Sequence, residues 1–289
     1  NIQPLTAILC VKQAHALKHY VMDPHQHSIG DACSAIKQAN NTITAELSIG
    51  GQEHFYLETQ ICSTMPTEEG GMLVFTSSQH PSEVQKLVAQ VIDVSLNKVT
   101  VDMRRMGGGF GGKETQAAQP ACLAALASHL TGKPCKMRLT RELDMRMTGK
   151  RHPFIVQYKV GINSQGLLSG LKLDLLADCG YSPDLSGSIV DRAMFHADNA
   201  YYLGNAIITG YRCKTHRASN TAYRGFGGPQ GMVAIENIMD HIARFMKVDP
   251  LVIRKLNYYQ QEQRNVTHYG QKVTGNLLDQ MTRELEDSC

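Results

Sequence analysis

The chain has 289 residues, of which 42% are hydrophobic and 19% charged, and its net charge is +3. A chain of this length and composition can bury a sizeable core, so it is neither a disordered chain nor a disulfide-stapled miniprotein. The small net charge and the 6% of aromatic residues argue against a nucleic-acid partner, and no apolar run reaches the roughly 18 residues of a membrane span.

The eight cysteines are scattered, with no C-x-x-C spacing and no histidine pair beside any of them. This spacing excludes zinc fingers and ferredoxin-like iron–sulfur sites. Scattered cysteines in a chain of this length are typical of reduced thiols, so we expect a cytoplasmic protein. The first residues, Asn1-Ile2-Gln3-Pro4, contain neither a methionine nor a signal-peptide pattern, and we interpret the sequence as an internal fragment of a longer protein.

Residues 1–45 are poorly patterned, with a polar, turn-rich stretch around Asp23 and Pro24. A short helix is expected at 31–40. We interpret the segment as a whole as a connector from a preceding domain.

Residues 72–139 predict a β-α-β unit followed by a glycine loop, a helix and a strand. A capping box with Ser82 at the N-cap predicts the start of the first helix. Gly132 closes the second, alanine-rich helix, which begins at about residue 114. The expected strands are 72–76, 98–103 and 135–139.

The second half of the chain contains two long runs of alternating hydrophobicity around a polar turn at 163–166, which predict a β-hairpin of residues 154–162 and 166–176. The remaining elements are a strand and three helices: 207–211, 230–246, a short helix capped by Asp249, and 276–286. Mixed βαβ and hairpin elements predict an α+β fold, not a doubly wound sheet.

The loop from Met106 to Glu114 holds five glycines around Phe110. Glycine permits close approach of the backbone to a ligand, and free N–H groups before a helix suit an anion. The loop nearly matches a P-loop, but Glu114 stands where Ser or Thr would hold magnesium, which argues against a nucleotide-binding module. It also matches G-x-G-x-x-G, yet no acidic residue follows at the distance required for ribose binding.

A second loop, Arg224 to Gly231, has the same design, with glycines around Phe226 and Pro229 at the start of the next helix. We therefore expect the two loops to form two sides of one site. Each offers main-chain donors and a phenylalanine ring that suits a planar ligand. The alternatives are a tight turn without a ligand for the first loop and core packing for each phenylalanine.

Together these loops resemble the molybdenum hydroxylases, the family of xanthine dehydrogenases and aldehyde oxidases. The details are similar to the separate molybdopterin-binding subunit of bacterial xanthine dehydrogenases. The resemblance implies that residues 46–289 form the first molybdopterin-binding subdomain, which is the first half of that domain, and that the second subdomain is missing from this chain. The segments that carry the resemblance are 50–59, 106–114, 148–154, 191–196 and 219–231.

The resemblance also assigns residues to the molybdenum–molybdopterin cofactor. Gln52 is expected to hydrogen-bond an oxygen ligand of molybdenum, with no direct protein ligand to the metal. The backbone at Phe110, Gly111 and Arg224 is expected to lie against the pterin. A turn residue after two glycines is the alternative for Gln52. FAD and 2Fe-2S clusters are expected on a partner subunit or domain of a large oligomer.

The substrate residues follow in the same way: Phe226 is expected to pack on the substrate ring, and Glu114 and Arg192 to be the catalytic pair that holds a purine. A carboxyl and a cation match the ring nitrogens and oxo groups of a purine. The resemblance therefore favours purine catabolism, with hypoxanthine and xanthine oxidised to urate and water as the oxygen source, over aldehydes or other N-heterocycles. The alternatives are a helix-dipole role for Glu114 and a salt bridge of Arg192 to Asp191 or Asp198.

The general base of the family, a glutamate near the far end of the molybdenum subunit, has no counterpart in this chain. Neither Glu53 nor Glu58 matches a motif that replaces it. We therefore expect the isolated 289 residues to be inactive. A non-catalytic assembly surface is the remaining alternative for the fragment.

Overall fold

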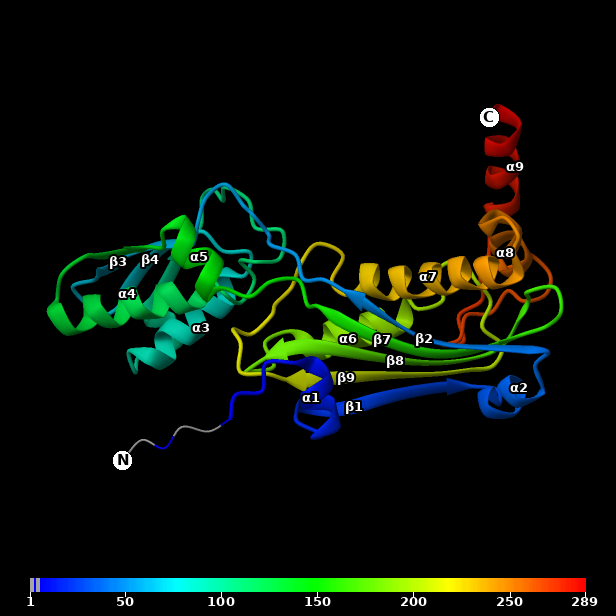
Figure 1. Ribbon diagram of the computed structural model, residues 1–289. Coiled ribbons are helices and arrows are strands. Elements are labelled where there is room, and N and C mark those ends of the chain that lie inside the picture. Colours follow the sequence, from blue (N-terminus) through cyan, green and yellow to red (C-terminus); the bar gives the residue numbers. More distant parts are fainter. Residues whose placement is uncertain (1–2, 4–5) are drawn as a thin grey trace.

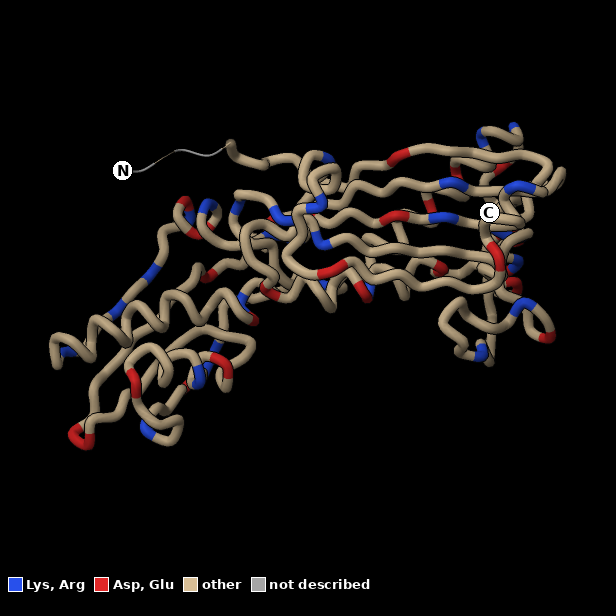
Figure 2. Tube along the Cα trace, turned by 90° about the horizontal axis from the view of Figure 1, so that it is seen from below, with Lys and Arg blue, Asp and Glu red and all other residues tan. Residues whose placement is uncertain are grey.

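The computed structural model of the chain describes residue 3 and residues 6–289. It is an elongated molecule with a smaller and a larger part, at the left and right of Figure 1. Lysines and arginines are interspersed with acidic residues along both parts (Figure 2), as the small net charge leads one to expect. Within the described residues, no helix is long and apolar enough to cross a membrane.

The larger part is built on a five-stranded sheet with the order β1-β9-β8-β7-β2. Strands β8 and β9 are parallel, and the other neighbours are antiparallel. The sheet contains the predicted hairpin, β7–β8, and the predicted strand β9. The bounds are β1 (Tyr20–Ile29), β2 (Asn41–Ile49), β7 (Phe154–Ile162), β8 (Leu168–Gly180) and β9 (Ala206–Lys214).

Helices cover both faces of this sheet (Figure 1). Helices α6 (Ser186–Phe195) and α7 (Gly228–Met246) bury one face, in a core that includes Val156, Leu173 and Ile238. Helices α1 (Val11–Ala16) and α2 (Ala32–Gln38) pack on the other face. Beyond α7 follow α8 (Pro250–Asn257), capped by Asp249 as predicted, and α9 (Leu278–Ser288).

The smaller part is a four-stranded sheet with the order β5-β4-β3-β6. Helices α3 (Pro81–Val91) and α4 (Ala118–Thr131) share one apolar core with it. A 3-10 turn (Leu96–Lys98) precedes β5, and α5 (Arg141–Met147) follows β6. The strands are β3 (Ile61–Pro66), β4 (Met72–Thr76), β5 (Val99–Asp102) and β6 (Cys135–Arg138).

The mixed sheets and helices confirm the predicted α+β fold, and two local predictions need correction. Helix α3 has His80 at its N-cap, not Ser82, because Pro81 occupies the first turn, where its missing N–H is harmless. Helix α4 ends at Gly132 with a φ of 65°, as predicted, but it begins only at Ala118 because residues 113–117 form turns.

The segment before residue 46, expected to be a connector, contains an ordered edge strand and the start of β2. Strand β1 pairs with β9 alone, so one of its edges has no partner strand. Pro24 lacks an N–H donor and is tolerated at such an edge, beside a register shift between Met22 and His25. An edge strand with polar residues on its exposed side gives no clear alternation, which is why the sequence did not indicate it.

Candidate functional site

The two glycine loops share an unusual backbone conformation. In the first loop, Phe110 has a φ of 53° between Gly108 at 93° and Gly111 at 97°. In the second loop, Phe226 has a φ of 49° between Gly225 at 96° and Gly227 at 94°. A phenylalanine in the left-handed region is strained, and glycine neighbours make so tight a path possible. The similar design noted in the sequence is therefore also a similar fold.

The loops lie directly against each other, as the sequence predicted. The backbone N–H of Arg224 donates to the carbonyl oxygen of Phe110 over 2.9 Å. A Cβ on Gly111 would lie 2.6 Å from the carbonyl oxygen of Ala222, so only glycine permits this approach. The second loop also packs on α6, because a Cβ on Gly227 would lie 1.9 Å from the carbonyl oxygen of Ile189.

A cavity of about 270 Å³ opens between the two loops. Five of the seven predicted site residues line it: Phe110, Gly111, Glu114, Arg224 and Phe226. Its other lining residues are Gln79, Ala222, Tyr223 and Gly225. Phe110 is 48% exposed, so it is not a core residue. The structure thus brings together most of the site that the sequence suggested.

Glu114 is partly buried at the edge of this cavity. Burial raises the pKa of its carboxyl group, and the nearby acidic groups of Asp184 and Glu83 raise it further, against a smaller opposite effect of His80. A raised pKa favours the protonated form, which can donate a hydrogen bond. Because α4 begins at Ala118, Glu114 does not lie in its first turn, and the helix-dipole alternative is wrong.

Arg192 lies outside the group of residues that line the cavity, on the exposed side of α6. Its predicted alternative, a salt bridge to Asp191 or Asp198, is wrong. Asp191 pairs with Arg212, and Asp198 accepts a hydrogen bond from Tyr259 at 2.7 Å. Among the described residues, no ion pair or hydrogen bond of the Arg192 side chain is found.

Arg192 lies in the part of α6 against which the second loop packs. Ile189, one turn before it, contacts Gly227, and His196, one turn after it, contacts Gly228. The charge of Arg192 also contributes, after burial, to a lowered pKa of His196. Within the described residues, the guanidinium is therefore an unpaired cation on the helix against which the second loop packs.

Gln52 also lies outside the cavity lining, yet a single arginine connects it to the second loop. The Arg151 Nε donates to the side-chain oxygen of Gln52 over 3.2 Å, and its Nη2 donates to the carbonyl oxygen of Arg224 over 2.9 Å. The guanidinium carbon lies 3.9 Å from the centre of the Tyr223 ring. Because the Gln52 oxygen is engaged, its amide NH₂ is left to donate elsewhere.

Two functional candidates escaped the sequence reasoning. Arg151 is one; its Nη1 is buried without a partner among the described residues. His54 is the other: its buried ring contacts the carbonyl oxygen of Ala222 through Nε2 at 2.6 Å. Burial lowers the pKa of His54, which favours the neutral ring, and the contact with a carbonyl oxygen requires the hydrogen to lie on Nε2. Both residues stand in segments that carried the family resemblance, but their contacts are far away in sequence.

Lys113 decides against the P-loop reading. Its side chain is fully buried, and its ammonium group contacts Glu58 at 3.1 Å and Ser77 at 2.9 Å. The side-chain oxygen of Gln79 accepts hydrogen bonds from the N–H groups of Gly111 and Lys113, at 2.8 and 3.3 Å. A P-loop needs these donors and this lysine for phosphate. The protein's own side chains satisfy them instead.

The Glu58–Lys113 ion pair also holds the first glycine loop in place, because the Glu58 carboxylate accepts a hydrogen bond from the N–H of Gly107 at 3.1 Å. Burial by itself raises the pKa of Glu58, but hydrogen bonds from Ser77, Gly107 and Lys113 hold it below its ordinary value. Burial lowers the pKa of Lys113, although Glu58 acts in the opposite direction. The pair is therefore structural.

Asp184 joins the two parts of the molecule next to the site. It accepts hydrogen bonds from Thr115 and Gln116, both at 2.8 Å, which follow the first loop. It also accepts from Thr221 at 2.7 Å, shortly before the second loop. One carboxylate thus sets the relative position of the loops. Across the described residues, no three His, Cys, Asp or Glu side chains gather as a metal site.

Comparisons with known proteins agree with this geometry. Residues 14–258 match the family model of the molybdopterin cofactor-binding domain. The chain is 44% identical to xanthine dehydrogenase of Calliphora vicina, covering 94% of this chain and 20% of that protein. It is 39% identical to xanthine dehydrogenase of Dictyostelium discoideum, covering 98% of this chain and 21% of that protein.

The fold is similar to that of the aldehyde oxidoreductase from Desulfovibrio gigas, with a TM-score of 0.89 and 23% sequence identity. That similarity covers 100% of this chain and 32% of the other. The chain spans about a fifth of the length of the curated relatives it matches. From the family match over most of its length, the chain belongs to the molybdopterin cofactor-binding domain family.

Proposed function

We propose that this chain forms one wall of the active site of a molybdenum hydroxylase that oxidises hypoxanthine and xanthine to urate, with water as the oxygen source. The observation that carries the proposal is the cavity between the two glycine loops, lined by Glu114, Phe226 and the backbone at Gly111. The names and identities of the xanthine dehydrogenase relatives support it. Because the chain spans about a fifth of those relatives, the activity is that of the whole protein.

The residues present fit a molybdopterin cofactor. Glycine at position 111 lets the two loops approach closely beside the cavity, and Phe110 offers an exposed ring there. Arg151 holds the side-chain oxygen of Gln52, and the amide NH₂, which has no partner among the described residues, can donate to a ligand. Gln52, Phe110, Gly111 and Arg224 would hold the cofactor. When bound, it supplies a molybdenum centre that accepts the electrons removed from the substrate.

The chain's own residues select the substrate. Phe226 offers its ring to a planar heterocycle. Burial raises the pKa of Glu114, which favours the protonated form that can donate a hydrogen bond to a ring nitrogen or oxo group of a purine. Arg192, which is unpaired among the described residues, would stabilise negative charge that develops on the purine ring as it is oxidised. An aldehyde needs neither group, so the pair favours purines over aldehydes.

Electron carriers and the general base belong to other parts of the whole protein. All eight cysteines are free, and no three of the His, Cys, Asp or Glu side chains in the described residues gather as a metal site, so we place the iron–sulfur clusters elsewhere. We propose that 2Fe-2S clusters and FAD lie on another domain or subunit, within an oligomer. The 289 residues by themselves are then inactive, and xanthine oxidation by this chain alone would contradict that statement.

A double substitution, Glu114→Val with Arg192→Met, tests the substrate assignment in the whole molybdenum-loaded protein. Loss of two groups that act on the purine transition state should lower kcat/KM for xanthine by roughly 100-fold or more, and for an aldehyde by less than about tenfold. The matched control is Glu142→Val with Arg146→Met, an exposed pair on α5 at 3.3 Å. Equal losses for xanthine and aldehyde would favour the aldehyde or other-heterocycle alternative.

A further inference from the structure

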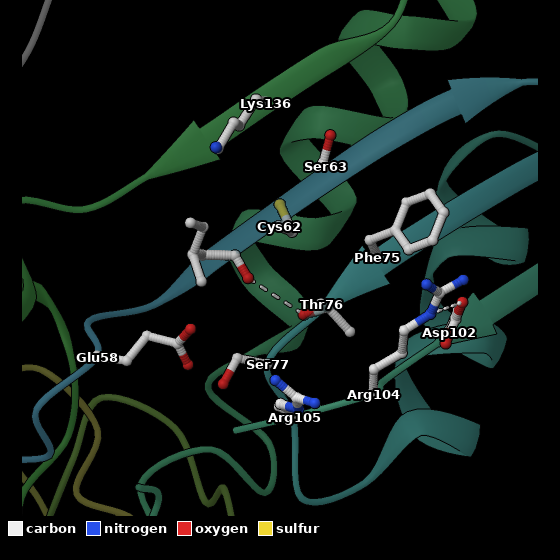
Figure 3. Close-up of a pocket in the computed structure, with 11 residues that line it drawn as sticks. Glu58, Cys62, Ser63, Phe75, Thr76, Ser77, Asp102, Arg104, Arg105 and Lys136 are labelled. Atoms are coloured by element: carbon white, nitrogen blue, oxygen red, sulfur yellow. Dashed lines mark hydrogen bonds and ion pairs between the residues drawn. The ribbon is translucent and has the colours of Figure 1, made fainter. Parts of the chain in front are cut away.

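A second cavity lies over the smaller sheet (Figure 3), and Glu58 and Ser77, which hold Lys113 of the first glycine loop, line one side of it. Its volume is about 710 Å³. In Figure 3, Phe75 and Ser63 rise from neighbouring strands, Lys136 lies at one end, and Arg104 and Arg105 lie at the other. Nothing in the proposed reaction uses these residues.

The cavity lies on the face of the sheet that faces away from the helices. Side chains of β3 alternate: Cys62 and Thr64 donate to carbonyl oxygens of α4, at 3.1 and 3.0 Å. Ser63 therefore points to the opposite face. Cross-strand pairing places it in one row with three further residues of that face, Lys136, Phe75 and Asp102.

This opposite face, which we call the open sheet face, carries partly exposed apolar side chains. Ile61, Leu73 and Phe75 are partly exposed, and Met65 is 43% exposed. The helices that share a core with this sheet, α3 and α4, lie on its other face. Contiguous apolar surface of this kind, bordered by polar residues, marks interaction sites.

The charge at the open sheet face is positive once internal pairs are set aside. Asp102 is neutralised by Arg104 at 3.0 Å, and Glu58 by Lys113 at 3.1 Å. Arg105 and Lys136 make no ion pair within the part of the chain that the structure describes. The same holds for Arg138, which pairs in register with Ile61 on this face. Three cations thus border the apolar centre without a counter-ion among the described residues.

We propose that the open sheet face docks an acidic segment of the same whole protein, which presents carboxylates around apolar side chains. Charge complementarity to Arg105, Lys136 and Arg138 identifies the acidic side chains. Because this chain spans about a fifth of the length of its relatives, other parts of the whole protein can supply the acidic segment. The docking does not depend on which substrate the whole protein oxidises.

Zero-length carbodiimide coupling in the purified whole protein tests the proposal, because it joins an amine to a carboxylate only when they touch. Lys136 should couple to an Asp or Glu outside these 289 residues. Lys86 is the matched control. It is an exposed lysine on α3, on the opposite side of the same sheet, and it should not couple to the same acidic segment. An amine-reactive acetylating reagent should modify Lys136 at least tenfold more slowly than Lys86. Equal modification, without coupling, would overturn the proposal.

A charge-reversed variant, Arg105→Glu with Lys136→Glu, provides a second measurement in the whole protein. The acidic segment should then be released, so that limited proteolysis between the domains becomes at least tenfold faster, while Lys86→Glu leaves the rate unchanged. Two outcomes would replace the proposed occupant. Protection of Lys136 that requires added inorganic phosphate would identify a small-anion site, and coupling between isotopically distinct copies of this chain would identify a second copy.

Discussion

The buried pair beneath the first glycine loop predicts an asymmetry between two substitutions. Lys113 is fully buried, whereas the Glu58 side chain is 38% exposed. Glu58→Gln leaves an ammonium group in the interior without its counter-ion. Lys113→Met removes that charge, fills the space with an unbranched apolar chain, and leaves a carboxylate that water can reach. We expect Glu58→Gln to be the more destabilising change.

The structure sets the magnitude. Two unit charges 3.1 Å apart attract by roughly 5 kcal/mol at an effective dielectric constant of about 20, and exposure of Glu58 reduces this value. Removal of one partner of a buried pair typically costs about 3–5 kcal/mol, so we expect about 3 kcal/mol for Glu58→Gln. Apolar replacement of a buried charge is often nearly neutral, so Lys113→Met should cost less than about 1 kcal/mol.

The difference depends on pH in a defined direction. The pKa of Glu58 lies below its ordinary value in the folded chain. Its stabilisation is therefore complete above the pKa of an unfolded glutamate, and it disappears as the pH falls through the lowered value. The gap between the parent chain and Glu58→Gln should be full at neutral pH and shrink in acid.

Urea unfolding, followed by circular dichroism, measures these free energies. The control is Glu142→Gln, which removes an exposed pair at 3.3 Å and should change stability by less than about 0.5 kcal/mol. If Lys113→Met is as destabilising as Glu58→Gln, or if the gap is independent of pH, the pair does not hold the loop in the way described.

Two further predictions concern the contacts between the loops. Gly111→Ala should destabilise the fold by about 3 kcal/mol, because residue 111 has a φ of 97° and the new Cβ would clash with Ala222. Gly132→Ala is the control: residue 132 has a φ of 65° and no neighbour near its Cβ, so the change should cost only about 1 kcal/mol. Equal free energies of unfolding in urea for the two variants would refute the clash. Arg151→Lys should lower kcat/KM of the loaded protein about tenfold without loss of molybdenum, because lysine cannot bridge Gln52 and Arg224 while it stacks on Tyr223; an unchanged value would exclude that bridge.

Much of the fold was predictable because local signals were strong. Hydrophobic and polar residues alternate over 154–162, and the observed strand β7 has these bounds. Gly132, in a left-handed conformation, ends α4 as predicted. The edge strand β1 was missed because pairing on one edge does not impose alternation. Helix α3 begins earlier than its apparent capping box because Pro81 takes the first turn.

The site was predictable to the extent that it is built from loops with unusual composition. Two glycine runs, each around one phenylalanine, indicated two sides of one site, and the structure joins them through Phe110 and Arg224. Arg151 and His54 were missed because their partners are distant in sequence; Gln52 is 99 residues away from Arg151. Sequence spacing also could not show that Asp191 pairs with Arg212 and so does not pair with Arg192.

Urate formation from xanthine by the whole protein that contains this chain, with molybdenum content measured in the same preparation, tests the central claim most directly. The account predicts turnover that scales with bound molybdenum and falls sharply when Glu114 and Arg192 are replaced together. Molybdenum-loaded protein without xanthine turnover would contradict the purine assignment and leave only the cofactor-binding family in place.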